Sequence, residues 1–235
     1  MRALTFGYSP CPNDTFAFHA LAHGLVDAPF RIRPVLLDIE ELNRRAHDVE
    51  FDLTKLSVGA FAGVGDPYRL LQSGAAPGKG VGPLAVTRTP MTLAEAVRGT
   101  LAIPGRETTA YRLLRLAAPS LGTVIEMRYD GILRAVASGE VEAGLIIHES
   151  RFTYAEHGLS KAVDLGEWWE QETGLPVSLA GICDRADLGD DLAGAAERAI
   201  RESMRSIIRR RAATTCAPTR RRCRTRSATR TSRCT

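Results

Sequence analysis

Short apolar runs alternate with segments of helical spacing along most of this chain, and this alternation restricts the folds open to it. The runs Leu4–Tyr8, Thr100–Ile103 and Val124–Met127 have the length and side-chain types of strands. Each precedes a segment whose apolar residues recur three and four positions apart, as in a helix. Strands that alternate with helices predict βαβ units, so we expect an α/β fold with mainly parallel sheets.

The alternation restarts once and then returns, which predicts two lobes joined by two crossings. A new series of strands and helices begins near residue 88, and a second seam lies near Gly174 and Leu175. A cleft between two lobes is a natural site for a small molecule, and it can close around its ligand. The expected units are a first α/β lobe of residues 1–88 plus 175–204, a second α/β lobe of residues 89–174 and a basic tail of residues 205–235.

Positive charge is concentrated at the C-terminal end of the chain. Eleven arginines and no acidic residue lie from Arg205 onward, which leaves 20 basic residues against 27 acidic ones in the rest of the chain. A nucleic-acid-binding tail would be expected to carry interleaved aromatic residues or an apolar face, and this one has neither. We therefore expect no specific nucleic-acid partner.

The cysteines and the N-terminus indicate a reducing compartment. Only Cys11 and Cys183 precede the tail, which does not suit a disulfide framework. No apolar run is long enough to span a bilayer. The first residues alternate like a strand and lack the apolar core of a signal peptide. We expect a cytoplasmic protein that has no membrane partner.

A histidine stands at the end of a predicted buried strand. The apolar run that begins at Ala143 stops at His148, and Glu149 and Ser150 follow it. In open α/β sheets, ligands bind beyond the carboxyl ends of the strands. A neutral imidazole in that place can take a proton from a substrate. The alternative is a core histidine satisfied by a backbone carbonyl, and this stretch alone favours neither reading.

Three loops connect a predicted strand to a predicted helix. Unpaired N–H groups and the positive end of the helix dipole suit a carboxylate or a phosphate at such a point. For any one loop, plain helix capping is the commoner role. The loops and their expected caps are Ser9–Thr15 with Asn13, Asp14 or Thr15, Gly105–Ala110 with Thr108 or Thr109, and the segment that starts at Asp130.

Lys55 lies inside an otherwise apolar strand, two residues before Ser57. A buried lysine needs a carboxylate partner or an anionic ligand, whereas a partly exposed one keeps its ammonium group in water. The pair His19 and His23 lacks the HExxH pattern of zinc enzymes, and the glycine-rich stretch of residues 74–82 fits no phosphate-binding fingerprint. We expect neither a metal nor a nucleotide cofactor.

Four stretches together carry a resemblance to a known family. They resemble the 1,4-dihydroxy-6-naphthoate synthases of the futalosine route to menaquinone, and the likeness runs from Leu4 to about Ser203. The resemblance implies a fold like that of periplasmic binding proteins, used here by a cytoplasmic enzyme. The stretches are Ser9–Phe16, Thr54–Ser57, Gly105–Arg106 with Thr108–Ala110, and Gly144–Tyr154.

The same resemblance implies the chemistry and the site. It implies conversion of cyclic dehypoxanthinyl futalosine to 1,4-dihydroxy-6-naphthoate, with release of dihydroxyacetone and without any cofactor. His148 corresponds to the family's proposed general base. Substrate contacts correspond to Lys55, Leu56 and Ser57, and to Thr109 and Ala110. We infer that the substrate carboxylate is held either by the helix start at Thr108 and Thr109 or by the first loop, with Ser9, Asn13 and Asp14.

Other functions remain as alternatives at this point. The nearest is chorismate dehydratase, an enzyme of the same pathway that shares the fold. The stretches Ser9–Phe16 and Ile146–Thr153 favour the synthase over it. A small-molecule carboxylate-binding protein would need export, and the sequence carries no signal peptide. A homodimer is left open.

The tail is where the chain departs from the family pattern. Relatives continue as helices and are longer, whereas here apolar periodicity and acidic residues both stop near residues 204–209. We hypothesise a frameshift at that point, and a native tail of this composition would be disordered. Sequencing the gene tests the frameshift, because an alternative reading frame must then restore an amphipathic helix.

Overall fold

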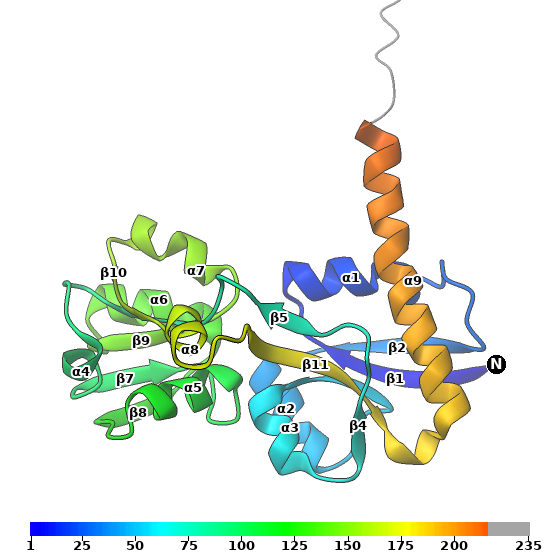
Figure 1. The fold of residues 1–235 in the computed structure, drawn as a ribbon, viewed down its shortest axis with the longest axis horizontal. Coiled ribbons are helices and arrows are strands. Elements are labelled where there is room, and N and C mark those ends of the chain that lie inside the picture. Colours follow the sequence, from blue (N-terminus) through cyan, green and yellow to red (C-terminus); the bar gives the residue numbers. More distant parts are fainter. Residues whose placement is uncertain (216–235) are drawn as a thin grey trace, which may run out of the picture.

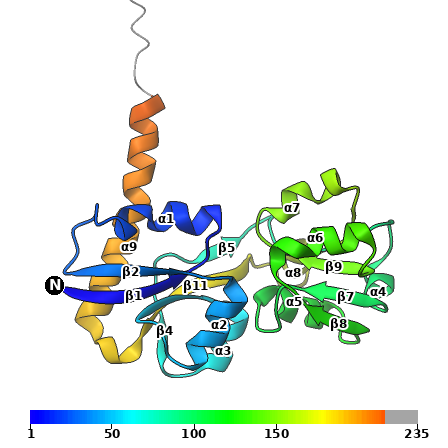
Figure 2. The ribbon, with the colours of Figure 1, turned by 180° about the vertical axis from the view of Figure 1, so that it is seen from behind.

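The computed structural model describes the backbone of residues 1–215 and the side chains of residues 1–206. Two mixed sheets, each covered by helices, lie side by side, and α9 extends away from the first of them (Figures 1 and 2). Residues 205–215 of the predicted tail continue α9 as a helix, and the rest of it, residues 216–235, lies outside the described residues. The predicted frameshift stays untested.

The first sheet has the strand order β2-β1-β3-β11-β4, and β5 pairs with β11 beyond that path. Its helices pack on both faces of the sheet (Figure 1). The elements of this lobe are β1 (Arg2–Tyr8), α1 (Pro12–Ala22), β2 (Phe30–Leu36), α2 (Ile39–His47), β3 (Leu53–Ser57), α3 (Val58–Val64), β4 (Tyr68–Leu70), β5 (Ala76–Gly78), β11 (Val177–Arg185), the short helix Ala186–Leu188 and α9 (Asp190–Thr215).

The second sheet has the strand order β10-β6-β9-β7-β8. Its elements are β6 (Leu84–Thr87), α4 (Leu93–Ala96), β7 (Thr100–Ile103), α5 (Thr109–Ala117), β8 (Thr123–Glu126), α6 (Tyr129–Ser138), β9 (Ala143–Ile146), α7 (Ser150–Thr153), the short helix Tyr154–His157, β10 (Ser160–Asp164) and α8 (Leu165–Thr173).

The predicted α/β class with two lobes is confirmed, and each sheet contains parallel βαβ units. Parallel pairs join β1 to β2 and β3, and β7 to β8 and β9. Antiparallel pairs add β11 to the first sheet, and add β6 and β10 to the second. Both sheets are therefore mixed, because the strands near the two crossings run against the others.

One predicted lobe boundary is wrong by a few residues. Residues 84–88 were assigned to the first lobe, but β6 pairs with β9 and β10 of the second sheet. The first crossing therefore precedes Leu84. The apolar run Leu84–Val86 is fully buried between two strands of the second lobe, which is why it belongs there. The return crossing lies before Val177, where β11 begins, close to the predicted seam.

Each lobe has its own apolar core. In the first lobe, Phe6, Tyr8 and Phe18 form a cluster of tilted and edge-on aromatic rings with centroids 4.9 to 5.2 Å apart. Such pairs add to the stabilisation that comes from burying the rings. Ala196 and Ile200 of α9 pack on the same cluster, so the last helix completes this core.

Two predicted helix caps are wrong, and one helix has no counterpart among the predictions. The first helix begins at Pro12, and its N-cap residue Cys11 makes no capping bond through its side chain. The cap of α6 is Arg128 and not Asp130. The residues after Ser57 form α3, which the sequence reading missed. Only Thr108 caps its helix as predicted, by accepting a hydrogen bond from the Tyr111 N–H group.

Within the described part of the chain, no helix is both long enough and apolar enough to cross a membrane.

Gly144 allows α6 to lie directly on β9. A Cβ atom at this position would come within 2.5 Å of Ile132 and 2.7 Å of Val136. We expect Gly144→Ala to lower the free energy of unfolding by about 1–3 kcal/mol, the usual cost of overpacking. The matched control is Gly63→Ala on α3, where a Cβ atom meets nothing within 4 Å. Urea unfolding measures both, and equal stability of the two variants would contradict this packing.

Candidate functional site

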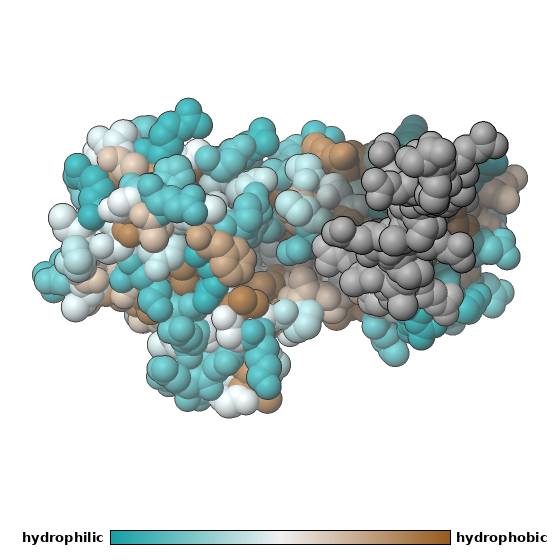
Figure 3. Space-filling model, turned by 90° about the horizontal axis from the view of Figure 1, so that it is seen from above, coloured by the Kyte–Doolittle hydropathy of each residue, from teal (hydrophilic) through white to brown (hydrophobic). Residues whose placement is uncertain are grey.

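A cavity of about 310 Å³ lies between the two lobes. Strand ends, helix starts, the first crossing and β11 contribute to its walls. Seen from above, apolar residues are visible in the region between the lobes (Figure 3). The lining residues are Cys11, Pro12, Asn13, Asp14, Ile39, Lys55, Ser57, Ala76, Val81, Pro83, Thr108, Thr109, Ala110, Ile147, His148, Glu149, Arg151, Phe152, Leu179 and Ala180.

Lys55 and Asp14 form a buried ion pair on the first-lobe side of the cavity. The Lys55 Nζ atom lies 2.7 and 2.8 Å from the two carboxylate oxygens of Asp14. Both side chains are less than a tenth exposed. The Ser9 N–H group also donates to Asp14, at 3.1 Å. Asp14 therefore serves as the partner that a buried lysine requires, and not as a helix cap.

Eight of the ten predicted site residues line the cavity, and two do not. The Leu56 side chain is buried with Tyr68 and Cys183 in a separate apolar cluster. Side chains alternate along a strand, so Leu56 points away from the face that presents Lys55 and Ser57. Ser9 is buried behind the cavity wall, where its hydroxyl accepts a hydrogen bond from the Cys11 N–H group.

His148 lies two residues beyond the end of β9. Its φ of +56° is in the left-handed region, which costs a residue other than glycine about 1–3 kcal/mol and is frequent at functional sites. Its ring meets the Tyr129 ring edge-on, with centroids 5.0 Å apart. Among the described residues, the buried Nε2 atom has no hydrogen-bond partner. His148 is one of the residues that line the cavity.

The surroundings of His148 favour its neutral form. Burial lowers the pKa of the imidazole below its ordinary value of 6.5, and the positive charge of Lys55 lowers this pKa further. Glu149, Asp14 and Asp38 act in the opposite direction with smaller effects. At neutral pH, the imidazole is therefore a base without a proton on one nitrogen.

The start of α5 forms the second-lobe wall. The Thr108 hydroxyl caps the helix and donates to the Gly105 carbonyl at 2.8 Å. The Thr109 hydroxyl donates to the Leu179 carbonyl at 2.6 Å and accepts from the Gly59 N–H group at 3.1 Å. Both hydroxyls are thus used within the protein. What remains for a ligand is the first turn of the helix, whose N–H groups lack intrahelical partners.

The sequence reading missed several lining residues. Arg151 and Phe152 belong to the stretch that resembles the family, but we assigned them no role. Arg151 pairs with Asp164 at 2.6 Å and donates to the carbonyls of Gly82 and Gly80, so it fixes the first crossing against α7. Phe152 is 71% exposed at the cavity wall. Lining residues such as Val81, on the first crossing, and Leu179, on β11, have no local signal, because only the fold brings them together.

Metal-ligating side chains do not gather in the part of the chain that the structure describes. No three His, Cys, Asp or Glu side chains there approach one another as they would around a metal ion. The polar groups that line the cavity include the His148 imidazole, the Lys55 ammonium group paired with Asp14, the Arg151 guanidinium group, the Glu149 carboxylate and the start of α5. These groups can accept a proton and hold an anion, which suits a small carboxylate ligand.

Comparison with known proteins gives a consistent assignment. Residues 4–229 match the model of a family described as menaquinone biosynthesis. The chain is 55% identical over 204 residues to a 1,4-dihydroxy-6-naphthoate synthase of Thermus thermophilus, covering 87% of this chain and 74% of that protein. It is 43% identical over 210 residues to the synthase of Streptomyces coelicolor, covering 86% and 73%.

Solved structures agree on the fold. The protein AF1704 from Archaeoglobus fulgidus superposes with a TM-score of 0.84 at 39% identity, covering 89% of this chain and 78% of that chain. The alkanesulfonate-binding protein of Xanthomonas axonopodis superposes with a TM-score of 0.68 at 14% identity, covering 91% and 77%. The second likeness shows the periplasmic-binding-protein-like fold alone.

The buried ion pair makes a stability test possible. In Asp14→Asn, the Lys55 ammonium group loses its carboxylate inside the protein, and we expect a loss of about 3–5 kcal/mol in the free energy of unfolding. Adding Lys55→Met removes the stranded charge and should restore part of that loss. Chemical denaturation measures both variants. A loss below about 1 kcal/mol in Asp14→Asn, the range of an exposed pair, would contradict the buried pairing.

Proposed function

The chain belongs to the menaquinone biosynthesis family, and on that premise we propose that it acts as a 1,4-dihydroxy-6-naphthoate synthase. One observation carries the proposal within this family. The inter-lobe cavity holds a buried imidazole nitrogen that has no partner among the described residues, opposite groups that can bind an anion. That is the arrangement needed to remove a proton from a bound carboxylate substrate.

The proposed reaction converts cyclic dehypoxanthinyl futalosine to 1,4-dihydroxy-6-naphthoate and releases dihydroxyacetone. It is a carbon–carbon lyase reaction, since a three-carbon fragment leaves a cyclised, partly reduced ring system. The steps are removal of a proton, cleavage of the carbon–carbon bond and aromatisation of the ring. Aromatisation supplies the driving force, so the protein has to supply a base, an anchor and a site closed to water.

His148 is the proposed base. Its lowered pKa favours the neutral imidazole at physiological pH, and its Nε2 atom has no hydrogen-bond partner among the described residues. Lys55, on the first-lobe side of the cavity, adds positive potential at His148. The anionic character that develops on the substrate as the proton leaves is therefore stabilised by a neighbouring cation.

The first turn of α5 is the proposed anchor for the ring carboxylate, together with Ser57 on the facing wall. Backbone N–H groups at Thr109 and Ala110 suit a carboxylate in both charge and geometry. Lys55 and Asn13 extend this polar wall along the first lobe. The remaining surface of the cavity is largely apolar, with Ile39, Ile147 and Phe152, and it suits the flat face of a bicyclic ring.

The proposal names a small-molecule carboxylate as the partner, places the reaction in the cytoplasm and requires neither a metal nor an organic cofactor. Chorismate dehydratase is the second candidate, because it shares the fold and also acts on a carboxylate. Incubating the purified protein with each substrate separates the two functions. Formation of 1,4-dihydroxy-6-naphthoate supports the proposal, and dehydration of chorismate alone would contradict it.

Replacing the base should abolish turnover and spare binding. We expect His148→Asn to lower kcat by a factor of about 10²–10⁴, the usual contribution of general base catalysis. The matched control is His157→Asn, an exposed histidine that does not line the cavity. Its kcat should equal that of the wild type. A wild-type rate in His148→Asn would remove His148 from the mechanism.

The pH profile should report the state of the imidazole. A base acts only when it is unprotonated, and burial and Lys55 lower the pKa of His148. The acid limb of kcat/KM should therefore fall below pH 6.5. In Lys55→Met, the lost positive charge and the unpaired Asp14 carboxylate both raise the pKa of His148, so the limb should move to higher pH. If the acid limb of kcat/KM in Lys55→Met stayed at the wild-type pH, the predicted effect of Lys55 on the pKa of His148 would be contradicted.

A further inference from the structure

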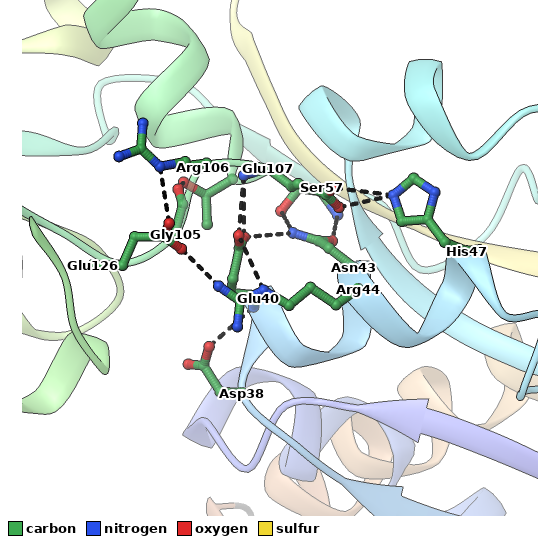
Figure 4. Close-up of polar contacts among 11 residues, drawn as sticks. Asp38, Glu40, Asn43, Arg44, His47, Ser57, Gly105, Arg106, Glu107 and Glu126 are labelled. Carbon is green, nitrogen blue, oxygen red and sulfur yellow. Dashed lines mark hydrogen bonds and ion pairs between the residues drawn. The ribbon is translucent and has the colours of Figure 1, made fainter. Parts of the chain in front are cut away.

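A buried carboxylate outside the cavity joins the two lobes behind its walls. Glu40, on α2 of the first lobe, has a side chain that is only 7% exposed. Its two carboxylate oxygens each lie 3.2 Å from the backbone nitrogen of Glu107, in the loop that leads into α5 of the second lobe. Figure 4 shows this carboxylate between the two lobes, with Asn43 and Arg44 beside it.

The loop of the second lobe is shaped to receive this carboxylate. Gly105 has a φ of +148°, and a Cβ atom on it would lie 2.1 Å from the Glu40 Cδ atom. Any other residue would collide with the carboxylate there. The absence of a side chain at Gly105 is therefore part of how the Glu107 N–H group reaches Glu40.

The contacts continue from Glu40 to the first-lobe wall of the cavity. The Asn43 side-chain amide donates to Glu40 at 3.4 Å and to the Ser57 hydroxyl at 3.1 Å. Its carbonyl oxygen accepts from the Ser57 N–H group at 3.0 Å. Asn43 is fully buried, so these hydrogen bonds do not compete with water.

We propose that Glu40 and Asn43 are positioning residues that fix the two anchoring walls of the cavity, Ser57 and the start of α5, relative to each other. The proposal rests on the proposed function, because it treats these two walls as the groups that hold the substrate. Neither residue lines the cavity. Both act through the backbone and side chains that they hold in place.

The hydrogen bonds that link Glu107, Glu40, Asn43 and Ser57 form a bridge between the lobes. Burial distinguishes this bridge from the other contacts between the lobes. Burial raises the pKa of Glu40, and its hydrogen bonds to Glu107 and Asn43 oppose that effect by stabilising the carboxylate. The Arg44–Glu126 ion pair and the hydrogen bond between His47 and Glu107 also join the two lobes, but they lie at the surface (Figure 4). Exposed pairs hold geometry weakly, whereas a desolvated hydrogen-bonded carboxylate has few alternative partners.

The bridge should affect substrate binding more than the chemical step. It touches the anchoring walls and leaves the imidazole of His148 in place. Some interactions stabilise the bound substrate and the transition state equally. Loss of such an interaction raises KM and leaves kcat unchanged. A residue needed only for folding would instead lower the amount of active enzyme, which reduces the apparent kcat at an unchanged KM.

The test compares Glu40→Gln and Glu40→Ala with the wild-type protein, using cyclic dehypoxanthinyl futalosine as substrate. Gln keeps one oxygen acceptor, and Ala leaves the N–H group of Glu107 without a partner. We expect KM to rise about threefold in Glu40→Gln and at least tenfold in Glu40→Ala, with kcat within threefold of wild type. The matched control is Glu126→Gln, which breaks exposed pairs to Arg44 and Arg106 and should leave KM unchanged.

Amide hydrogen exchange gives a second readout that does not depend on turnover. Exchange at the Glu107 N–H group should rise in Glu40→Gln, and exchange at the Ser57 N–H group should rise with it. The Glu126→Gln control should leave both unchanged. This measurement tests the bridge even if the synthase assay fails for the wild-type protein, an outcome that would reject the proposed function and not the bridge.

Three results would overturn the proposal. The first is an unchanged KM in folded Glu40→Ala. The second is an equal rise of KM in Glu126→Gln, which would indicate general contact between the lobes. The third is faster exchange at Glu107 without any change at Ser57, which would show that the two walls are not coupled. If Glu40→Ala does not fold, Glu40→Gln decides by the same criteria.

Discussion

The buried ion pair between Lys55 and Asp14 is the interaction on which the candidate site depends. It joins the middle of β3 to the first turn of α1 and supports the first-lobe side of the cavity. A lysine in this place would otherwise lose its hydration without compensation. Because the pair is buried, the charge of Lys55 is felt at His148, where it adds to the effect of burial and keeps the imidazole neutral.

The cleft also depends on contacts that cross from one lobe to the other. Thr109 binds the Leu179 carbonyl and the Gly59 N–H group, Arg151 holds the first crossing, and Glu40 receives the loop before α5. These contacts use backbone groups on one side and side chains on the other. The anchoring walls and the base are therefore positioned by different sets of bonds, so binding and chemistry can be disturbed separately.

Local patterns predicted the elements and the resemblance predicted the family, whereas partners across the fold could not be read from either. The cap at Thr108 was predicted because capping depends on neighbouring residues. Asp14 was taken for a cap because its partner Lys55 is 41 positions away. No local pattern marks Glu40 as part of the site, since nothing near it in sequence shows that Gly105 and Glu107 will cover it. Leu56 was carried over within a motif, although strand alternation turns it into the core.

The central claim is that the inter-lobe cavity binds the naphthoate ring with its reacting edge at His148. A crystal structure of the protein with 1,4-dihydroxy-6-naphthoate bound tests it most directly. The account predicts the ring inside the cavity, its carboxylate within hydrogen-bond distance of the first turn of α5 or Ser57, and the hydroxylated ring facing His148 Nε2. A ring bound outside the cavity, or one that leaves His148 Nε2 without a facing ligand atom, would contradict it.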